Sequence, residues 1–221
     1  MIRFLVFLST IISGLCELKP MLAAKGKLLL QEDFASGHSD KWQFLHGTRF
    51  NVEDGTLVGI GSTKKYQAAH AGSHSGKTPS SKLHKISRNV ILQFSFQMKE
   101  GLREVHIGAN DGNFKTGSGH VGRITFSTKT GLTVVKDRNI RIEGDKTEKL
   151  KNTPYEFKND QWYTVMVEFV GDTLAAQVEN GPSISAQNIR FQSTKSDINL
   201  PTRGGGKVIY DNIYIWQAAS K

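Results

Sequence analysis

The sequence predicts an all-β protein, a two-sheet jelly-roll sandwich, from alternating polarity in several segments and from the glycine-rich turns between them. In residues 89–99, five apolar side chains occupy every second position and share one face of a strand. Residues 161–170 alternate in the same way, and Gly171-Asp172 then makes a short turn into residues 173–179. The last two segments are therefore expected to form a hairpin.

Further strands are expected along the rest of the chain. Residues 120–127 and 132–136 have the pattern of a second hairpin, and residues 207–217 are apolar on both faces, as in a strand inside a two-sheet stack. Residues 61–81 are small and polar and predict a long surface loop, whereas residues 146–152 alone look helical. Shorter candidate strands lie at 27–34, 49–52, 56–59 and 103–109.

The first 24 residues have the order of a secretory signal peptide, a positive start followed by a 12-residue apolar run at 4–15. That run is too short to cross a bilayer, and no other apolar run approaches 18 residues. Cleavage is expected between 16 and 24, after either Cys16 or Ala24, which leaves residues 25–221 as a single domain. Lipidation of Cys16 is an alternative, although Leu15 stands where a small residue is usual.

Composition narrows the class of protein. The chain has 221 residues, enough for one all-β domain, and 38% of them are hydrophobic, enough for a substantial core. A single Cys excludes an intramolecular disulfide framework and a Cys-rich zinc site. The net charge is +9, but the basic residues are scattered and no nucleic-acid motif is present. We therefore expect an exported bacterial protein, periplasmic or extracellular, with a saccharide or anionic polysaccharide as partner rather than nucleic acid. A merely soluble basic surface is the alternative, and the oligomeric state is not predicted.

A family resemblance extends over residues 28–217. The segments that carry it are 33–37, the region of Trp42, 51–59, 83–98, 109–112, 119–126, 134–139, 159–181 and 210–216. Together they resemble the bacterial 3-keto-disaccharide hydrolase-like domain, a concanavalin A-like or laminin-G-like jelly roll. The resemblance implies glycan chemistry, either hydrolysis of oxidised disaccharides, as in active members, or sugar binding, as in related sandwiches.

The chain departs from the family at its catalytic strand. The Asn-Ser-Gly element and the Glu-x-Gln-x-x-Asp strand of active members are absent, as is the Glu-x-Asp-x-x-Glu strand of laminarinase-type glucanases. The nearest counterpart is residues 104–111. This departure favours a binding module, whereas coverage of nearly the whole chain, with no separate catalytic domain, favours an enzyme.

The candidate site is built on that counterpart strand. Glycosidic cleavage generally needs two carboxyl groups, and Glu104, His106 and Asp111 are the candidate catalytic residues. Glu104 and His106 share a strand face because they are two positions apart. The candidate substrate-binding residues, expected on the same concave face or able to stack on a sugar, are His120, Arg123, Asp137 and Trp162.

Plainer roles are open for several of these residues. Asn110-Asp111-Gly112 is also a turn sequence, and Arg123 would coat the outer face of a sheet equally well. His70 and His74 have the spacing of two metal ligands on a helix, but no third ligand is placed. No cofactor is expected. Calcium enters by fold analogy alone, so the metal ligands stay unknown.

Two functions from different classes follow from these observations. The first is an exported carbohydrate-active domain, resembling 3-keto-disaccharide hydrolases, that acts on glycosidic bonds of oxidised saccharides. The alternative is a non-catalytic glycan-binding or envelope-interaction module of the same fold. A structural envelope protein that docks on anionic polymer is a third hypothesis.

Overall fold

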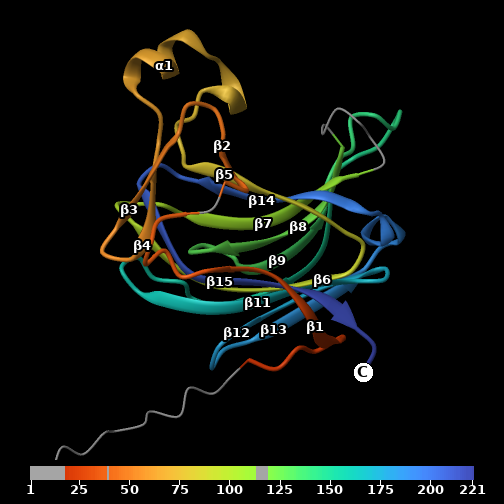
Figure 1. Cartoon of the computed structure of the whole chain (residues 1–221). Helices are drawn as coiled ribbons and strands as arrows, with labels where there is room; N and C mark the ends of the chain where they lie inside the picture. Colours follow the sequence, from red (N-terminus) through yellow and green to blue (C-terminus); the bar gives the residue numbers. More distant parts are fainter. Residues whose placement is uncertain (1–17, 39, 113–118) are drawn as a thin grey trace, which may run out of the picture.

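The computed structural model describes residues 18–38, 40–112 and 119–221, and in these residues two antiparallel sheets pack face to face (Figure 1). The predicted two-sheet jelly-roll sandwich is confirmed. Sheet A has the order β13-β12-β11-β6-β15-β4-β3, with β1 also paired to β15, and sheet B has the order β10-β9-β8-β7-β14-β5-β2.

The strands of sheet A are β1 (Ala24–Glu32), β3 (Arg49–Glu53), β4 (Thr56–Ile60), β6 (Val90–Lys99), β11 (Trp162–Val170), β12 (Thr173–Val178), β13 (Ser183–Gln187) and β15 (Lys207–Ala219). The strands of sheet B are β2 (Trp42–Phe44), β5 (Ser80–Ser87), β7 (Glu104–Asp111), β8 (His120–Ser127), β9 (Gly131–Lys136), β10 (Glu148–Thr153) and β14 (Lys195–Arg203). Short helices connect some of them: α1 (Lys64–Ala69), η1 (Gly72–His74) and η2 (Ile189–Gln192). Within the described ranges, no helix has the length and apolar character needed to cross a bilayer.

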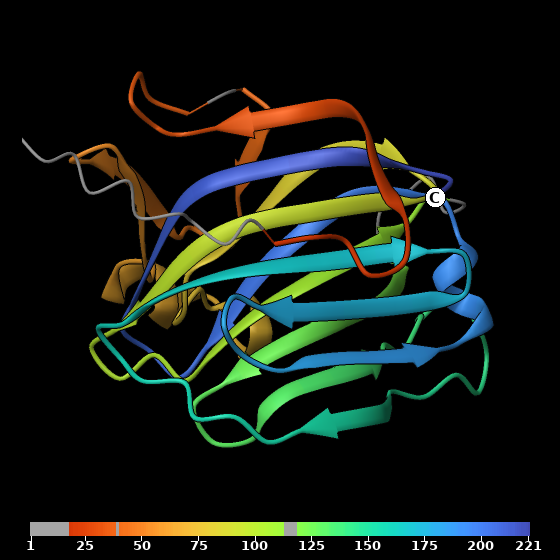
Figure 2. The same cartoon turned by 90° about the horizontal axis from the view of Figure 1, so that it is seen from below.

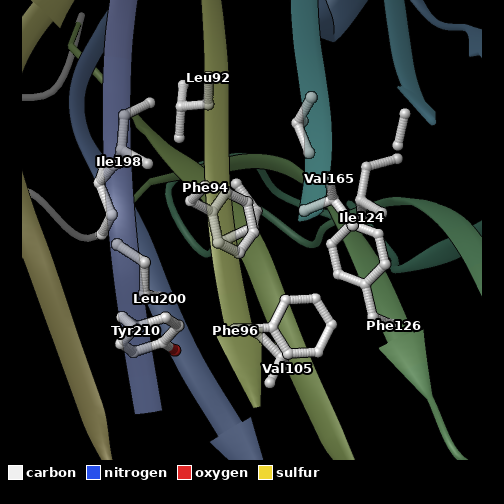
Figure 3. Packing of buried hydrophobic residues seen from close by; sticks show 14 of the residues in the cluster. Leu92, Phe94, Phe96, Val105, Ile124, Phe126, Val165, Ile198, Leu200 and Tyr210 are labelled. Atoms are coloured by element: carbon white, nitrogen blue, oxygen red, sulfur yellow. The ribbon is translucent and has the colours of Figure 1, made fainter. Parts of the chain in front are cut away.

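The core lies between the two sheets and follows from the alternation of the strands. Phe94 and Phe96 of β6 are fully buried and meet Phe126 of β8 at ring-centroid distances of 6.3 and 5.5 Å. Figure 3 shows these rings with aliphatic side chains contributed by both sheets. Each such ring removes a large apolar area from water, which favours folding by roughly 2–3 kcal/mol.

Two local predictions were wrong. Residues 146–152 were expected to be helical, but β10 pairs with β9 at the edge of sheet B. Residues 61–81 were expected to be a loop, but they hold α1, whose first turn is capped by the Thr63 hydroxyl accepting from the Tyr66 N–H at 3.2 Å. The segment that carries α1 stands clear of the sandwich on the outer side of sheet B (Figure 1).

Residues 18–23 cross the outer side of sheet A before β1 begins (Figure 2). We call this segment the N-terminal strap. The Glu168 carboxylate on β11 accepts hydrogen bonds from the backbone N–H groups of Met21, Leu22 and Ala23 at 2.5, 2.9 and 3.3 Å. Ala23 also packs on buried Ile91 and Met166. The predicted signal peptide lies largely at residues 1–17, outside the described residues, and the position of cleavage stays a prediction.

Candidate functional site

The outer face of sheet B carries a continuous set of polar side chains. On β7, Val105, Ile107 and Ala109 belong to the core. Because strand side chains alternate, Glu104 and His106 project to the opposite, outward face. The expected pairing of these two residues on one face is therefore confirmed, with His106 Nε2 lying 2.8 Å from Glu104 Oε2.

Gly108 is a buried, close-packed position in the middle of this face. Strand pairing places Arg123 of β8 on one side of it and Asn199 of β14 on the other. A Cβ atom at position 108 would lie 3.2 Å from both the Arg123 Cβ and the Gly122 carbonyl oxygen. A side chain here would crowd its neighbours, so glycine allows the strands to pack closely beside Arg123.

A pocket of about 240 Å³ opens at the Glu104 end of the face. We call it the Glu104 pocket. Its lining residues come from β7, β8, β9, β10, β14 and nearby turns: Glu104, Arg123, Thr125, Thr130, Thr133, Val135, Thr147, Lys149 and Arg203. Hydroxyl groups, cations and one carboxylate therefore converge on one hollow, which suits a polar ligand.

The protonation of the pair at the pocket edge follows from burial. His106 is only 3% exposed, and desolvation lowers its pKa, although the hydrogen bond to Glu104 acts in the opposite direction. The hydrogen bond from His106 lowers the pKa of Glu104 in turn. At neutral pH a neutral His106 therefore donates Nε2–H to an ionised Glu104 carboxylate.

Arg123 lines the side of the pocket, and its guanidinium group has only part of its hydrogen-bonding capacity satisfied. It forms an ion pair with Asp137 through one terminal nitrogen, so these two predicted residues are brought together. Burial lowers the pKa of Arg123 to about 10, with a further lowering from the nearby charge of Arg203. Its Nε is buried and has no hydrogen-bond partner within the described part of the chain.

A second polar cluster lies at the other end of the face, around Asp197 of β14. Asp197 is 4% exposed and its carboxylate lies 2.6 Å from His84 Nδ1 and 3.9 Å from Lys82 Nζ. Asn110 donates Nδ2–H to the same carboxylate at 3.2 Å. Asn110 Oδ1 accepts a hydrogen bond from Asn199 Nδ2–H at 2.8 Å and lies 3.0 Å from Nδ1 of predicted His120.

The structure separates Asp111 from Glu104 and His106. Asp111 is the last residue of β7 and lies on the inward side, where its carboxylate accepts from Ser193 Oγ at 3.3 Å. Its charged neighbour is Lys195, whose Nζ lies 5.3 Å from the Phe169 ring in the core. The expectation that Asp111 joins the other two on one face was wrong, because an odd number of positions separates it from them.

Trp162 also lies apart from the other candidates. It begins β11 in sheet A and is 43% exposed on the outer face of that sheet. It was predicted to stack on a sugar with the other substrate-binding candidates, but β11 belongs to sheet A, whereas β7 and β8 belong to sheet B. The alternation of residues 161–170 gave the correct face of the strand and no information on which sheet held it.

The predicted histidine pair is not arranged as two metal ligands. His70 ends α1 and stacks on the Tyr66 ring at 3.9 Å, whereas His74 Nδ1 lies 3.3 Å from His46 Nδ1. Over residues 18–38, 40–112 and 119–221, no group of three or more His, Cys, Asp or Glu side chains is placed to hold a metal ion. The calcium suggested by fold analogy stays without assigned ligands.

Comparisons with known proteins define the class of fold. No family model matches the chain, and no curated protein matches it in sequence. Among solved structures, carbohydrate-binding module CBM66 from Bacillus subtilis is similar with a TM-score of 0.54 at 10% identity, over 80% of this chain and 96% of that one.

Two glucanases are similar as well. The β-glucanase of Bacillus licheniformis gives a TM-score of 0.59 at 9% identity, over 87% of this chain and 99% of that one. The laminarinase of Flavobacterium sp. UMI-01 gives 0.57 at 14% identity, over 86% and 100%. At such identities the likeness shows the fold, which is the concanavalin A-like jelly roll.

Proposed function

We propose that this protein binds saccharide on the outer face of sheet B, as a glycan-binding module. The observation that carries the proposal is the Glu104 pocket in this polar face, where hydroxyl and charged groups line one hollow. Sugars present many hydroxyl groups, and a face lined by fixed donors and acceptors satisfies them. The likeness in fold to a carbohydrate-binding module and to glucanases adds support.

The spacing of the carboxylates favours binding over hydrolysis. Three carboxylates lie on or beside this face at described positions: Glu104, Asp137 and Asp197. Strand pairing places Asp197 beside Asn110, six positions from Glu104, which corresponds to ~20 Å along the strand. Asp137 lies at a similar level, two strands away. Glycosidases hold their two carboxyl groups about 5–10 Å apart, so neither residue is a suitable partner for Glu104.

Hydrolysis of oxidised disaccharides, as in 3-keto-disaccharide hydrolases, is the second candidate. The contact between Glu104 and His106 favours it, because an ionised carboxylate beside a neutral imidazole is a plausible acid–base pair. Arg123 and Arg203 line the same pocket and would polarise a sugar carbonyl. Under either function we propose that the protein is exported, as its first residues indicate.

A glycan array probed with the full chain tests the binding function, followed by titration of the best ligand against two matched variants. Thr125→Val removes a hydroxyl from the Glu104 pocket while preserving shape, and we expect about tenfold weaker binding. Thr164→Val removes a hydroxyl from the opposite sheet, beside Ser95, and should leave affinity unchanged. Retention of no glycan, or equal losses in both variants, contradicts the proposal.

Incubation with 3-keto-glucosides and ordinary disaccharides separates the two candidates. Saturable retention without turnover supports the binding module. Turnover that disappears in Glu104→Gln establishes the hydrolase. Turnover that survives this substitution shows that Glu104 is not the catalytic carboxylate.

A further inference from the structure

The Glu104 pocket has an excess of positive charge. Three cationic side chains line it, those of Arg123, Lys149 and Arg203, against the single carboxylate of Glu104. That carboxylate already accepts a hydrogen bond from His106, and Arg203 Nε lies 4.0 Å from it. One carboxylate therefore faces three cations across the same hollow.

Arg123 and Arg203 act on each other as like charges. The charge of Arg203 disfavours protonated Arg123, whose own carboxylate partner, Asp137, lies toward the other end of the face. The Arg123 Nε–H is also buried without an acceptor among residues 18–38, 40–112 and 119–221. An anionic group placed between the two guanidinium groups would relieve the repulsion and accept this hydrogen bond.

The face offers charge and hydrogen bonds in place of aromatic stacking. At paired outward positions of the central strands β14, β7 and β8, the side chains are polar and none is Phe, Tyr or Trp, as at Asn199, His106, Arg123 and Thr125. The exposed Trp162 belongs to the other sheet. Discrimination between saccharides on this face must then come from polar groups and charge.

We propose that the Glu104 pocket selects saccharides that bear an anionic substituent, a carboxylate or a sulfate, bound between Arg123 and Arg203. The inference rests on the proposed function and specifies its ligand class. Planar guanidinium groups match the oxygen geometry of carboxylate and sulfate through paired hydrogen bonds, which an ammonium group does not reproduce. The rest of the sugar would lie against the threonine hydroxyls of the same pocket, among them those of Thr125 and Thr133.

Two matched pairs of polymers test the proposal by isothermal titration of the full chain. Polygalacturonate is compared with its methyl ester, and dextran sulfate is compared with dextran, so the members of each pair share a sugar backbone and differ in the anionic substituent. We expect at least one charged polymer to bind. Its neutral counterpart should bind at least about tenfold more weakly. The two pairs distinguish carboxylate from sulfate.

A charge-matched set of variants locates the binding. Arg203 is 66% exposed, so Arg203→Gln is expected to fold and to weaken binding of the charged polymer about tenfold. Arg203→Lys should restore part of the loss. Lys27→Gln removes the same charge from an exposed position on sheet A and should have little effect.

The outcomes separate this inference from the proposed function. Equal affinity for charged and neutral polymers overturns the inference and leaves saccharide binding intact. Equal losses in Arg203→Gln and Lys27→Gln also overturn it, because they indicate general attraction of a basic protein to polyanions. If no polymer binds, the inference fails, and the glycan array decides the proposed function.

Discussion

Glu104 and His106 differ in their access to water, although they form one hydrogen-bonded pair. The Glu104 side chain is 28% exposed at the pocket edge, whereas His106 lies in the sheet surface with its ring covered. Solvent therefore reaches the carboxylate and not the imidazole. Protonation of His106 places a charge in a poorly solvated position beside Arg123, which gives the folded protein a sensitivity to acid.

We predict that stability falls as the pH drops below about 6.5, the unfolded value for histidine, and that His106 is responsible for part of the loss. The sign follows from the lowered pKa of His106, since the unfolded chain binds a proton that the folded chain resists. The free energy of unfolding by urea, measured at pH 7.5 and 5.5, should show a smaller difference between the two values in His106→Gln than in the original protein.

In His106→Gln, the dependence of the free energy of unfolding on pH should become weaker without disappearing. Desolvation also lowers the pKa values of His46 and His120, so these residues contribute in the same direction. The lowered pKa of Glu104 adds a separate loss of stability at more acidic pH, below the ordinary carboxyl range. An unchanged pH slope in His106→Gln would contradict the assignment.

Local pattern predicted part of the site and missed the part that depends on strand pairing. Glu104 and His106 were found because two-residue spacing is a property of any strand. Asp197 contacts Asn110 across 87 positions of sequence, and no local pattern encodes that pairing. The alternation of Asp197 and Asn199 with buried Ile198 indicates which face of β14 points outward. It does not indicate which strands pair with β14.

At the scale of elements, the N-terminal strap completes the outer side of sheet A. Glu168 is 1% exposed and collects three backbone N–H groups from the strap, while Gln177 donates to the Lys19 carbonyl oxygen at 2.6 Å. The strap also shields Met166 from water. A buried carboxylate is tolerated here because its oxygens are satisfied by these donors.

We predict that Glu168→Ala destabilises the fold by roughly 2–3 kcal/mol, because it removes a charged acceptor from buried donors. Urea unfolding measures the effect. The control is Glu156→Gln, which should change stability little, because the Glu156 side chain is 77% exposed and pairs with Lys158 at 3.6 Å.

Truncation of the chain tests the strap directly. A chain that begins at residue 18 should keep the stability of the full chain, and one that begins at residue 25 should lose about as much as Glu168→Ala. Equal stability of the two truncated chains would show that the strap contributes nothing.

Alternating polarity in the sequence located strands with one buried face. Residues 89–99 and 161–170 correspond to β6 and β11, and the predicted hairpin partner of the latter is β12. β10 was missed because most of its residues are exposed to solvent, so this edge strand has no alternation of apolar side chains. Its lysine-rich sequence is equally compatible with a helix. α1 was missed because all six of its residues lack burial, so no apolar stripe marks it.

At the scale of the whole molecule, stability comes from one core shared by the two sheets. Phe94 of sheet A contacts Phe126 of sheet B and also Tyr210 of β15, at 6.4 Å between ring centroids. A change at this position therefore acts on both layers at once. Each layer alone would leave an apolar face in water.

We predict that Phe94→Ala lowers the free energy of unfolding by about 3–5 kcal/mol, through lost burial and the cavity left behind. Phe94→Leu keeps most of the volume and should lose less than half of that. Thermal and urea unfolding measure both variants. Similar losses for the two substitutions would mean that the site collapses around the smaller side chain.

β15 pairs with β6, β1 and β4 in the interior of sheet A, yet it follows all three in the chain. Ala219 lies opposite Ala24 in the completed sheet. During synthesis, β1, β4 and β6 leave the ribosome long before the strand that joins them, and they must wait with unpaired edges. Pairings between such distant residues form slowly, since the intervening chain must first be ordered. Sheet A is therefore expected to form slowly and only after β15 has been synthesised. The risk of aggregation is greatest before then, while the edges of the earlier strands are open.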